Sequence, residues 1–181
     1  MKHMKTLNVS ATIFCIGLLF FLVACGPSLD DQKAEISKIE AELKTEAGVM
    51  PDSVNSALAV GKYLEFVNAH PEDTMSPIYL FNGARVSAQT GNMHVAMQML
   101  ERLYTEYPKH ADAPQALFLK GFLAETQMAD FKTAEKCYNE FLKLYPNHPL
   151  ATDVSFSLKN LGKPPEQLLK ELSASDSVKT K

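Results

Sequence analysis

The chain of 181 residues contains no tryptophan and only 8 glycines. A β-sandwich needs many tight turns, and glycine supplies their left-handed conformations, so this shortage favours a helical chain. A cluster of basic residues is also missing, since 18 Lys and Arg are balanced by 21 Asp and Glu for a net charge of −3. Without a basic patch the chain lacks the electrostatic footprint of a nucleic-acid-binding protein. Its hydrophobic share of 46% is that of a globular protein.

The usual motifs of catalysis and metal binding are absent from the sequence. It has no Gly-rich phosphate loop, no G-x-S-x-G elbow and no CxxC pair. No two histidines have the i, i+4 spacing of a helical zinc site, and His70, His110 and His148 each fall in a predicted inter-helix turn. Acid pairs such as Glu40 with Glu42 are expected on solvated helix faces. We therefore expect no catalytic residue, no metal site and no cofactor, and a protein that is not an enzyme.

The three cysteines provide no disulfide framework. Cys15 lies inside an apolar run, Cys25 ends that run, and Cys137 lies on the apolar face of a predicted helix. A free cysteine in such a position behaves as a small hydrophobic residue. We expect Cys137 to be buried and unpaired, and a catalytic role for it is the less favoured alternative.

The N-terminus has the features of a secretory signal. Lys2 and Lys5 precede an uncharged apolar run from Ala11 to Ala24. This run is shorter than the ~20 residues that span a bilayer as a helix, and it matches the hydrophobic region of a signal peptide. An ordinary signal peptide with a chance cysteine and an uncleaved anchor remain as alternatives.

The end of the run, Leu22-Val23-Ala24-Cys25 followed by Gly26, resembles the lipobox of bacterial lipoproteins. The resemblance implies that residues 1–24 are a cleaved signal peptide, that Cys25 is lipidated, and that residues 25–29 are the lipidated tether. Several acyl chains on one residue anchor a protein stably, whereas one chain holds only weakly. Gly26, where an Asp would imply inner-membrane retention, implies the outer membrane. We expect the periplasmic face, and the pair Asp30-Asp31 leaves surface export open.

A recurring helical stripe organises the rest of the chain. Apolar residues at i, i+3, i+4 and i+7 predict one buried helix face, and such a set occurs twice, with a weaker third copy at 59–71. The two full sets are Ala96, Met99, Leu100 and Leu103, followed by Pro108, and Ala134, Cys137, Tyr138 and Phe141, followed by Pro146. A helical signature that returns at nearly equal intervals predicts an all-α solenoid of helix-turn-helix repeats.

The repeat extends to the helix before each stripe. Gly83 precedes Ala96 by the same number of positions as Gly121 precedes Ala134, so we expect two antiparallel helices to cross closely there. Ser76-Pro77 predicts a helix start with Ser76 as the cap, and Gly91 predicts a left-handed helix end. We predict a helical domain over 30–172 with full repeats at about 77–108 and 114–146. Half-repeats at 51–71 and 149–172, an N-terminal helix at 30–47 and a disordered tail at 173–181 complete the layout.

This arrangement resembles the tetratricopeptide repeat, a helix pair of about 34 residues with large, Gly, Ala, aromatic and Pro positions. The matching residues are Tyr79, Gly83, Ala96, Leu100 and Pro108 in one repeat, and Leu117, Gly121, Ala134, Tyr138 and Pro146 in the next. Asn82 and Lys120 stand where the repeat has leucine. The longer unit is similar to two envelope families, the BamD-type assembly lipoproteins and the CpoB-type Tol–Pal-associated proteins.

The resemblance implies a peptide groove on the concave surface, lined by the first helix of each pair. In register, that groove includes Leu80, Ala84, Ser87, Phe118, Phe122 and Glu125. The alternative is that Phe118 and Phe122 pack on neighbouring helices.

The favoured function is a membrane-anchored scaffold for protein or peptide partners in the bacterial envelope, in outer-membrane protein assembly or envelope maintenance. A self-assembling spacer that uses the helix at 30–47 is the alternative, and the oligomeric state is left open. Nucleic acid is not an expected partner.

Overall fold

The computed structural model describes residues 26–43, 53–164 and 166–170, and within them all regular structure is helical. The helices are α2 (Leu29–Leu43), α3 (Ser53–Ala69), α4 (Met75–Gln89), α5 (Met93–Glu106), α6 (Ala113–Thr126), α7 (Phe131–Leu144) and α8 (Ala151–Lys159). A further short helical segment covers 166–170. The all-α prediction is confirmed. The predicted signal peptide, the lipidation site Cys25 and the tail at 173–181 lie outside the described residues.

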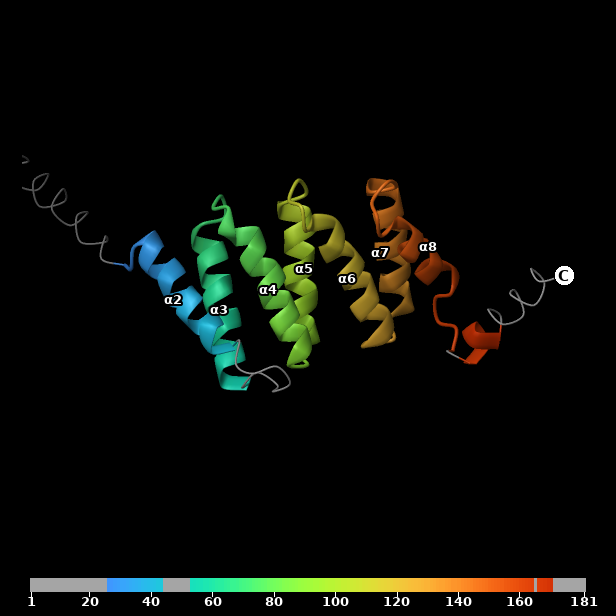
Figure 1. Cartoon of the computed structure of the whole chain (residues 1–181), viewed down its shortest axis with the longest axis horizontal. Coiled ribbons are helices and arrows are strands. Elements are labelled where there is room, and N and C mark those ends of the chain that lie inside the picture. The colour runs from blue at the N-terminus through green and yellow to red at the C-terminus, as the bar shows by residue number, and fades with distance from the viewer. Residues whose placement is uncertain (1–25, 44–52, 165, 171–181) are drawn as a thin grey trace, which may run out of the picture.

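The helices form a row in chain order. Each of α2 to α8 packs mainly on the helices that precede and follow it in the chain. From α3 onward the connecting turns alternate between the upper and the lower edge of the row, so that neighbouring helices run antiparallel (Figure 1). An architecture in which each unit contacts only its neighbours is an α-solenoid.

The repeat has a constant length in the described structure. The first helices α4, α6 and α8 begin at Met75, Ala113 and Ala151, which lie at equal intervals along the chain. Equivalent turns also share their hydrogen bonds: the Nδ1 atom of His110 accepts the backbone N–H of Asp112, and that of His148 accepts the N–H of Leu150, both at 3.2 Å. These histidines therefore shape the turns, as their positions in the sequence predict.

The predicted start of α4 is wrong in its details. The helix begins at Met75, whose backbone N–H is accepted by the carboxylate of Asp73 at 2.8 Å. Ser76 is therefore inside the helix, and its hydroxyl donates to the carbonyl of His70 at 2.6 Å instead of capping. The left-handed end at Gly91 is confirmed, with a φ of 79°. One repeat later, Ala129 adopts the same conformation with a φ of 51°.

The N-terminal helix is part of the repeat array. Ile36 and Ile39 of α2 are 3% and 7% exposed because they pack into the core that α3, α4 and α5 share. The ammonium group of Lys33 lies 2.7 Å from the carboxylate of Asp73 in the turn before α4. Thus α2 occupies the place of a first helix and α3 that of its second helix. The half-repeat predicted at 51–71 corresponds to α3, and α2 stands before it as the first helix of the pair.

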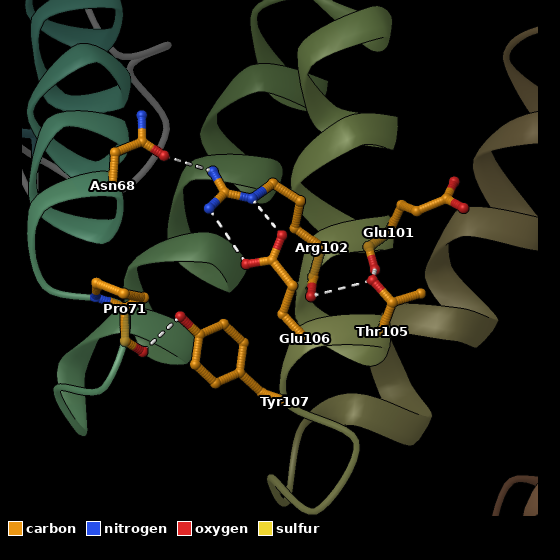
Figure 2. A network of polar contacts seen from close by, with 7 residues as sticks. All are labelled: Asn68, Pro71, Glu101, Arg102, Thr105, Glu106 and Tyr107. Atoms are coloured by element: carbon orange, nitrogen blue, oxygen red, sulfur yellow. Dashed lines mark hydrogen bonds and ion pairs between the residues drawn. The ribbon is translucent and has the colours of Figure 1, made fainter.

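Polar contacts join the second helices of successive pairs (Figure 2). Arg102 of α5 donates to both carboxylate oxygens of Glu106, at 2.8 and 3.2 Å, and to the side-chain oxygen of Asn68 on α3 at 3.0 Å. The hydroxyl of Tyr107 donates to the carbonyl of Pro71 at 2.7 Å. The bonds to Asn68 and Pro71 link α5 to α3 and to the turn that follows α3, and the bonds to Glu106 within α5 orient the Arg102 side chain.

Candidate functional site

The two repeat glycines lie where helices approach closely. A β-carbon built on Gly121 would lie 2.8 Å from Cε1 of Tyr138 and 3.0 Å from Cβ of Cys137. On Gly83 it would collide with the end of the Met99 side chain and lie 3.2 Å from a ring carbon of Tyr63. The close crossing is therefore present. At Gly121 the atoms that fill the crossing belong to residues three and four positions after the repeat alanine, whereas at Gly83 they belong to Met99, three positions after it, and to Tyr63 of α3.

The two residues that replace leucine before these glycines connect successive pairs. Lys120 is only 9% exposed, and its ammonium group pairs with the carboxylate of Glu101 on α5. Burial is the largest single effect and lowers the pKa of Lys120, but the hydrogen bond with Glu101 and the charge interactions with Tyr104, Cys137 and Glu101 together outweigh it, so the pKa is raised. Asn82 makes the equivalent link, since its amide donates to the carboxylate of Glu40 on α2 at 3.3 Å. The departures from the repeat pattern are thus inter-repeat polar contacts.

Buried tyrosines hold a carboxylate at each end of the array. The hydroxyl of Tyr63 donates to Glu40 at 2.8 Å, and that of Tyr138 donates to Glu125 at 2.7 Å. Burial, and then these hydrogen bonds, raise the pKa of both hydroxyls, so both stay neutral donors. Glu125, which the sequence places in a ligand groove, is therefore engaged with Tyr138.

The middle pair lacks such a hydrogen bond. Leu100 and Ser87 stand at the positions that Tyr138 and Glu125 occupy one repeat later. The hydroxyl of Ser87 is buried and finds no hydrogen-bond partner among the described residues. Among the described residues this tyrosine–carboxylate hydrogen bond is therefore a feature of the outer pairs, and the middle pair is linked to them through Asn82 and Glu101 instead.

The predicted groove is only partly open. Leu80 and Ala84 are 0% exposed and Ser87 is 1% exposed, because α4 lies in the middle of the row and is covered by neighbours on both sides. These three residues form core, and their place in an open groove is corrected accordingly.

The two phenylalanines of the predicted groove differ from each other. The ring of Phe118 is half-buried, with centroids 6.2 Å from Tyr138 and 6.5 Å from Phe141, so the packing alternative describes it. Phe122 is 42% exposed and remains on the surface.

A cleft that the sequence did not reveal lies between the first helices α2 and α4. Its volume is about 460 Å³, and it is lined by Glu40, Leu43, Tyr63, Asn82, Arg85, Val86 and Gln89. Sequence reasoning placed Glu40 on a solvated face, but this residue is half-buried between α3 and α4. The polar residue Asn82 at a leucine position was the available signal, since a buried amide needs a partner.

The residues that line the cleft are suited to binding a ligand, because they combine a fixed carboxylate with polar donors and apolar walls. Tyr63 and Asn82 both donate to Oε1 of Glu40, which fixes the carboxylate in place. Arg85 and Gln89 add donors at the rim, while Leu43 and Val86 supply apolar walls.

Burial raises the pKa of the Cys137 thiol, which lies in the core and stays protonated at neutral pH.

The described residues also bear on metal binding and on membrane insertion. Within the described part of the chain, no three His, Cys, Asp or Glu side chains gather as potential metal ligands. In the same residues no helix has the length and apolar character needed to cross a bilayer.

The antiparallel pairs, the constant unit length and the glycine crossings define a helical-repeat protein of the solenoid class. The family model for the tetratricopeptide repeat matches residues 115–148, which cover nearly all of α6 together with α7. The match coincides with the last full repeat predicted from the sequence, and with the helix pairs it supports a tetratricopeptide-repeat protein. No curated protein matches the chain.

Proposed function

We propose that this chain is a membrane-tethered scaffold that binds a segment of a partner protein in the cleft between α2 and α4. Tetratricopeptide repeats generally mediate protein–protein interactions, which supports a binding role rather than catalysis. The observation that carries the proposal is the carboxylate of Glu40, held in place by Tyr63 and Asn82 at the floor of an open cleft. A preorganised charge binds a ligand with little loss of side-chain freedom.

The lining favours an extended peptide with one cationic side chain. The cleft volume of about 460 Å³ falls within the roughly 300–1,000 Å³ of ligand sites, and it accommodates side chains rather than a folded domain. A lysine or arginine of the partner would reach Glu40 and lay its aliphatic stem on Leu43 and Val86. The amides of Asn82 and Gln89 match the donors and acceptors of a peptide backbone.

The tether is the second part of the proposal. Leu22 to Gly26 supports lipidation of Cys25 and attachment to the outer membrane on its periplasmic side. Tethering confines scaffold and partner to a thin layer and raises their effective concentration, so a modest cleft is sufficient for binding. Outer-membrane protein assembly or envelope maintenance is the role that these features fit.

Site-specific photocrosslinking in cells tests both parts. A photoreactive residue in place of Arg85, at the cleft, should give a discrete adduct, and one in place of Gln98 on α5 should not. Glu40→Gln removes the charge but keeps the acceptor for Tyr63, and it should weaken the adduct at least tenfold. Glu42→Gln, on the exposed side of α2, is the matched control.

In the same cells, Cys25→Ser should move the protein from the membrane to the soluble fraction. An adduct of equal strength with Glu40→Gln would disprove the role of the carboxylate. A cleaved protein that stays in the membrane fraction after Cys25→Ser would disprove the lipid tether.

A further inference from the structure

The carboxylate of Glu125 has surroundings like those of Glu40, at the other end of the array. Each lies on a first helix, is half-buried, and accepts a hydrogen bond from a buried tyrosine of its own second helix. Each is also flanked by the next first helix. Asn82 of α4 donates to Glu40, and Ser157 of α8 lies within reach of the Tyr138 hydroxyl that holds Glu125. The residues between α6 and α8 therefore repeat the arrangement at the floor of the cleft between α2 and α4.

The Glu125 carboxylate has a further oxygen to offer and no cation beside it. Its Oε2 atom accepts the Tyr138 hydroxyl at 2.7 Å, whereas Oε1 has no hydrogen-bond donor among the described residues. The ion pairs of the described residues all involve other carboxylates. A donor that carries a positive charge makes the strongest hydrogen bond to a carboxylate. Glu125 is thus a fixed negative charge whose complement is a cationic side chain.

An exposed aromatic ring lies on the same face of α6. Phe118, Phe122 and Glu125 are spaced i, i+4 and i+7, so they share one side of the helix. The ring centroid of Phe118 lies 6.2 Å from that of Phe122 and 6.2 Å from that of Tyr138. The three rings therefore form a row that leads to the hydroxyl at Glu125. Tyr138 is buried and Phe118 half-buried, but Phe122 is 42% exposed, which leaves a ring open beside the carboxylate.

The earlier first helices do not combine a ring with a carboxylate in this way. In α4, Ala84 and Ser87 stand at the positions of Phe122 and Glu125, and both are in the core. In α2, Ser37 precedes Glu40 by three residues, as Phe122 precedes Glu125. The two carboxylates are therefore offered with different neighbours, aliphatic walls in the N-terminal cleft and an aromatic ring on α6.

We propose that Glu125 and Phe122 form a second anchor for the partner segment, and that this anchor takes an arginine side chain. A guanidinium group is planar, so its edge donates to Oε1 of Glu125 while its face stacks on the Phe122 ring. A lysine ammonium group is a compact charge without such a flat face. The inference rests on the proposed binding of a partner segment by the first helices, but the anchor is a separate site and is tested separately.

The spacing of the two anchors sets the spacing of the cationic residues that bind them. Glu40 and Glu125 lie two units apart, with the middle pair between them. Packed helices lie about 8–10 Å apart, so two units correspond to roughly 20–40 Å along the row. An extended segment rises about 3.3 Å per residue, so its two cationic side chains should be about 6–12 residues apart.

NMR titration of the full chain, labelled with nitrogen-15 and held in a non-ionic detergent, tests the anchor directly. The probe is acetyl-arginine amide, whose guanidinium is its only charge, and acetyl-lysine amide is the comparison. The arginine probe should shift the amide signals around Phe122 and Glu125 saturably, with a dissociation constant of about 1–10 mM. The lysine probe should bind there at least about threefold more weakly. The signals around Glu40 report on the proposed cleft in the same spectra.

Substitutions assign the response to these two side chains. Glu125→Gln keeps an acceptor for Tyr138 but removes the charge, and it should weaken arginine binding at α6 at least about fivefold while the response at Glu40 stays the same. Phe122→Leu should abolish the preference for arginine over lysine. The matched controls are Glu135→Gln, an exposed carboxylate of α7, and Phe131→Leu, a ring of similar exposure, and they should change neither result.

The outcomes separate this anchor from the proposed cleft. No saturable response at α6, or an equal response in Glu125→Gln, would overturn the anchor even if the signals around Glu40 respond. A response at α6 without one at Glu40 would support the anchor and overturn the cleft.

Peptides with two arginines test whether one segment uses both anchors. In a Gly-Ser background, the separation of the arginines is varied from about 2 to about 16 residues. Affinity should exceed that of a one-arginine peptide about tenfold at separations of about 6–12 residues and should fall when the link is too short to span the sites. Both Glu40→Gln and Glu125→Gln should remove the gain. A gain that does not depend on separation, or that survives either substitution, would overturn the shared segment.

Discussion

The two repeat glycines have different neighbours, and the difference decides what each can tolerate. At Gly121 the nearest atoms belong to the ring of Tyr138 and to Cβ of Cys137, which is fixed to the backbone of α7. At Gly83 the first obstacle is the end of the flexible Met99 side chain. Met99 can choose another rotamer, whereas Tyr138 is tied to Glu125 by its hydroxyl.

We predict that Gly121→Ala destabilises the fold by about 1–3 kcal/mol, because it overpacks a crossing that cannot relax. Gly83→Ala should lose less than half as much. Gly61→Ala is the control: nothing lies within 4 Å of its added methyl, and alanine in an exposed helix interior should stabilise by about 0.5–1 kcal/mol. Urea unfolding measures all three. Equal losses at Gly83 and Gly121 would contradict the distinction between flexible and fixed neighbours.

At this scale the sequence predicts which positions are buried more reliably than what they contact. The apolar stripe from Ala134 to Phe141 is in the core, as its spacing predicts. Glu40 and Glu125 were assigned to solvent and to a ligand, yet both accept a hydrogen bond from a buried tyrosine. The partners are 23 and 13 residues away in the chain, and no local pattern reveals such pairs.

Among the elements, α2 is joined to the rest of the array partly by ion pairs. Besides the two isoleucines, it is attached through Lys33, which pairs with Asp73 in the turn before α4. The hydrogen bond from Lys33, followed by that from the N–H of Met75, lowers the pKa of Asp73 below its usual 3.8. The resulting stabilisation is present above the unfolded-state pKa and is lost as the pH falls through the lowered folded-state pKa.

We therefore predict that Asp73→Asn lowers stability at pH 7 by about 1 kcal/mol or less, as for a partly exposed ion pair. The difference from the unmodified chain should be constant above about pH 5 and should vanish as the pH falls below 3.8. Melting curves from pH 7 to about pH 2.5 measure it. Glu72→Gln, at the exposed neighbouring position, is the control. A difference that persists unchanged at the lowest pH would show that the carboxylate charge is not involved.

Helical periodicity was sufficient to predict the helices α4 to α8. It did not reveal that α2 is the first helix of a pair with α3. Two physical reasons account for this. Residues 44–52 make the interval between α2 and α3 longer than that within the later pairs, and α2 has no glycine, so the Gly-to-Ala spacing of the other pairs does not occur here. The apolar seam with Ile36 and Ile39 is also too short for an independent coiled coil, so it predicts packing on the next helix without revealing the repeat register. The place of α2 is determined by contacts between residues that are far apart in the sequence. The sequence did not reveal the cleft between α2 and α4 because its lining depends on the same contacts.

At the scale of the whole molecule, the row of helices implies that each helix is stabilised mainly by its immediate neighbours. Because each helix packs mainly on its chain neighbours, the two ends of the array should be able to open independently. The reactivity of the Cys137 thiol measures how often the C-terminal end of the array opens. Cys137 is 2% exposed, burial raises its pKa, and it is the only thiol of a chain that begins at Gly26.

We predict that Val154→Ala in α8 accelerates thiol labelling of Cys137 under native conditions by about tenfold or more. Val154 is fully buried in the same core as Cys137, so its truncation leaves a cavity there. Each loss of about 1.4 kcal/mol raises the open population tenfold. Ile36→Ala in α2 removes a comparable buried group at the other end and should leave the labelling rate within about twofold. Timed reaction with a maleimide gives both rates. Equal acceleration by both substitutions would mean that the array unfolds as one cooperative unit.

The constant unit length also makes the array extendable, as far as side chains at the junction allow. A second copy of residues 113–150, inserted after residue 150, would keep every helix start in phase and present the next α6 to α7. At that new junction the duplicated Lys120 would face Asn139, which stands where Glu101 stands one unit earlier. A buried ammonium group would lose its carboxylate there, so duplication alone would leave a charge unpaired. Changing the first Asn139 to Glu would restore the link, so the side chain at this one position decides whether an added unit keeps the ion pair between neighbouring pairs.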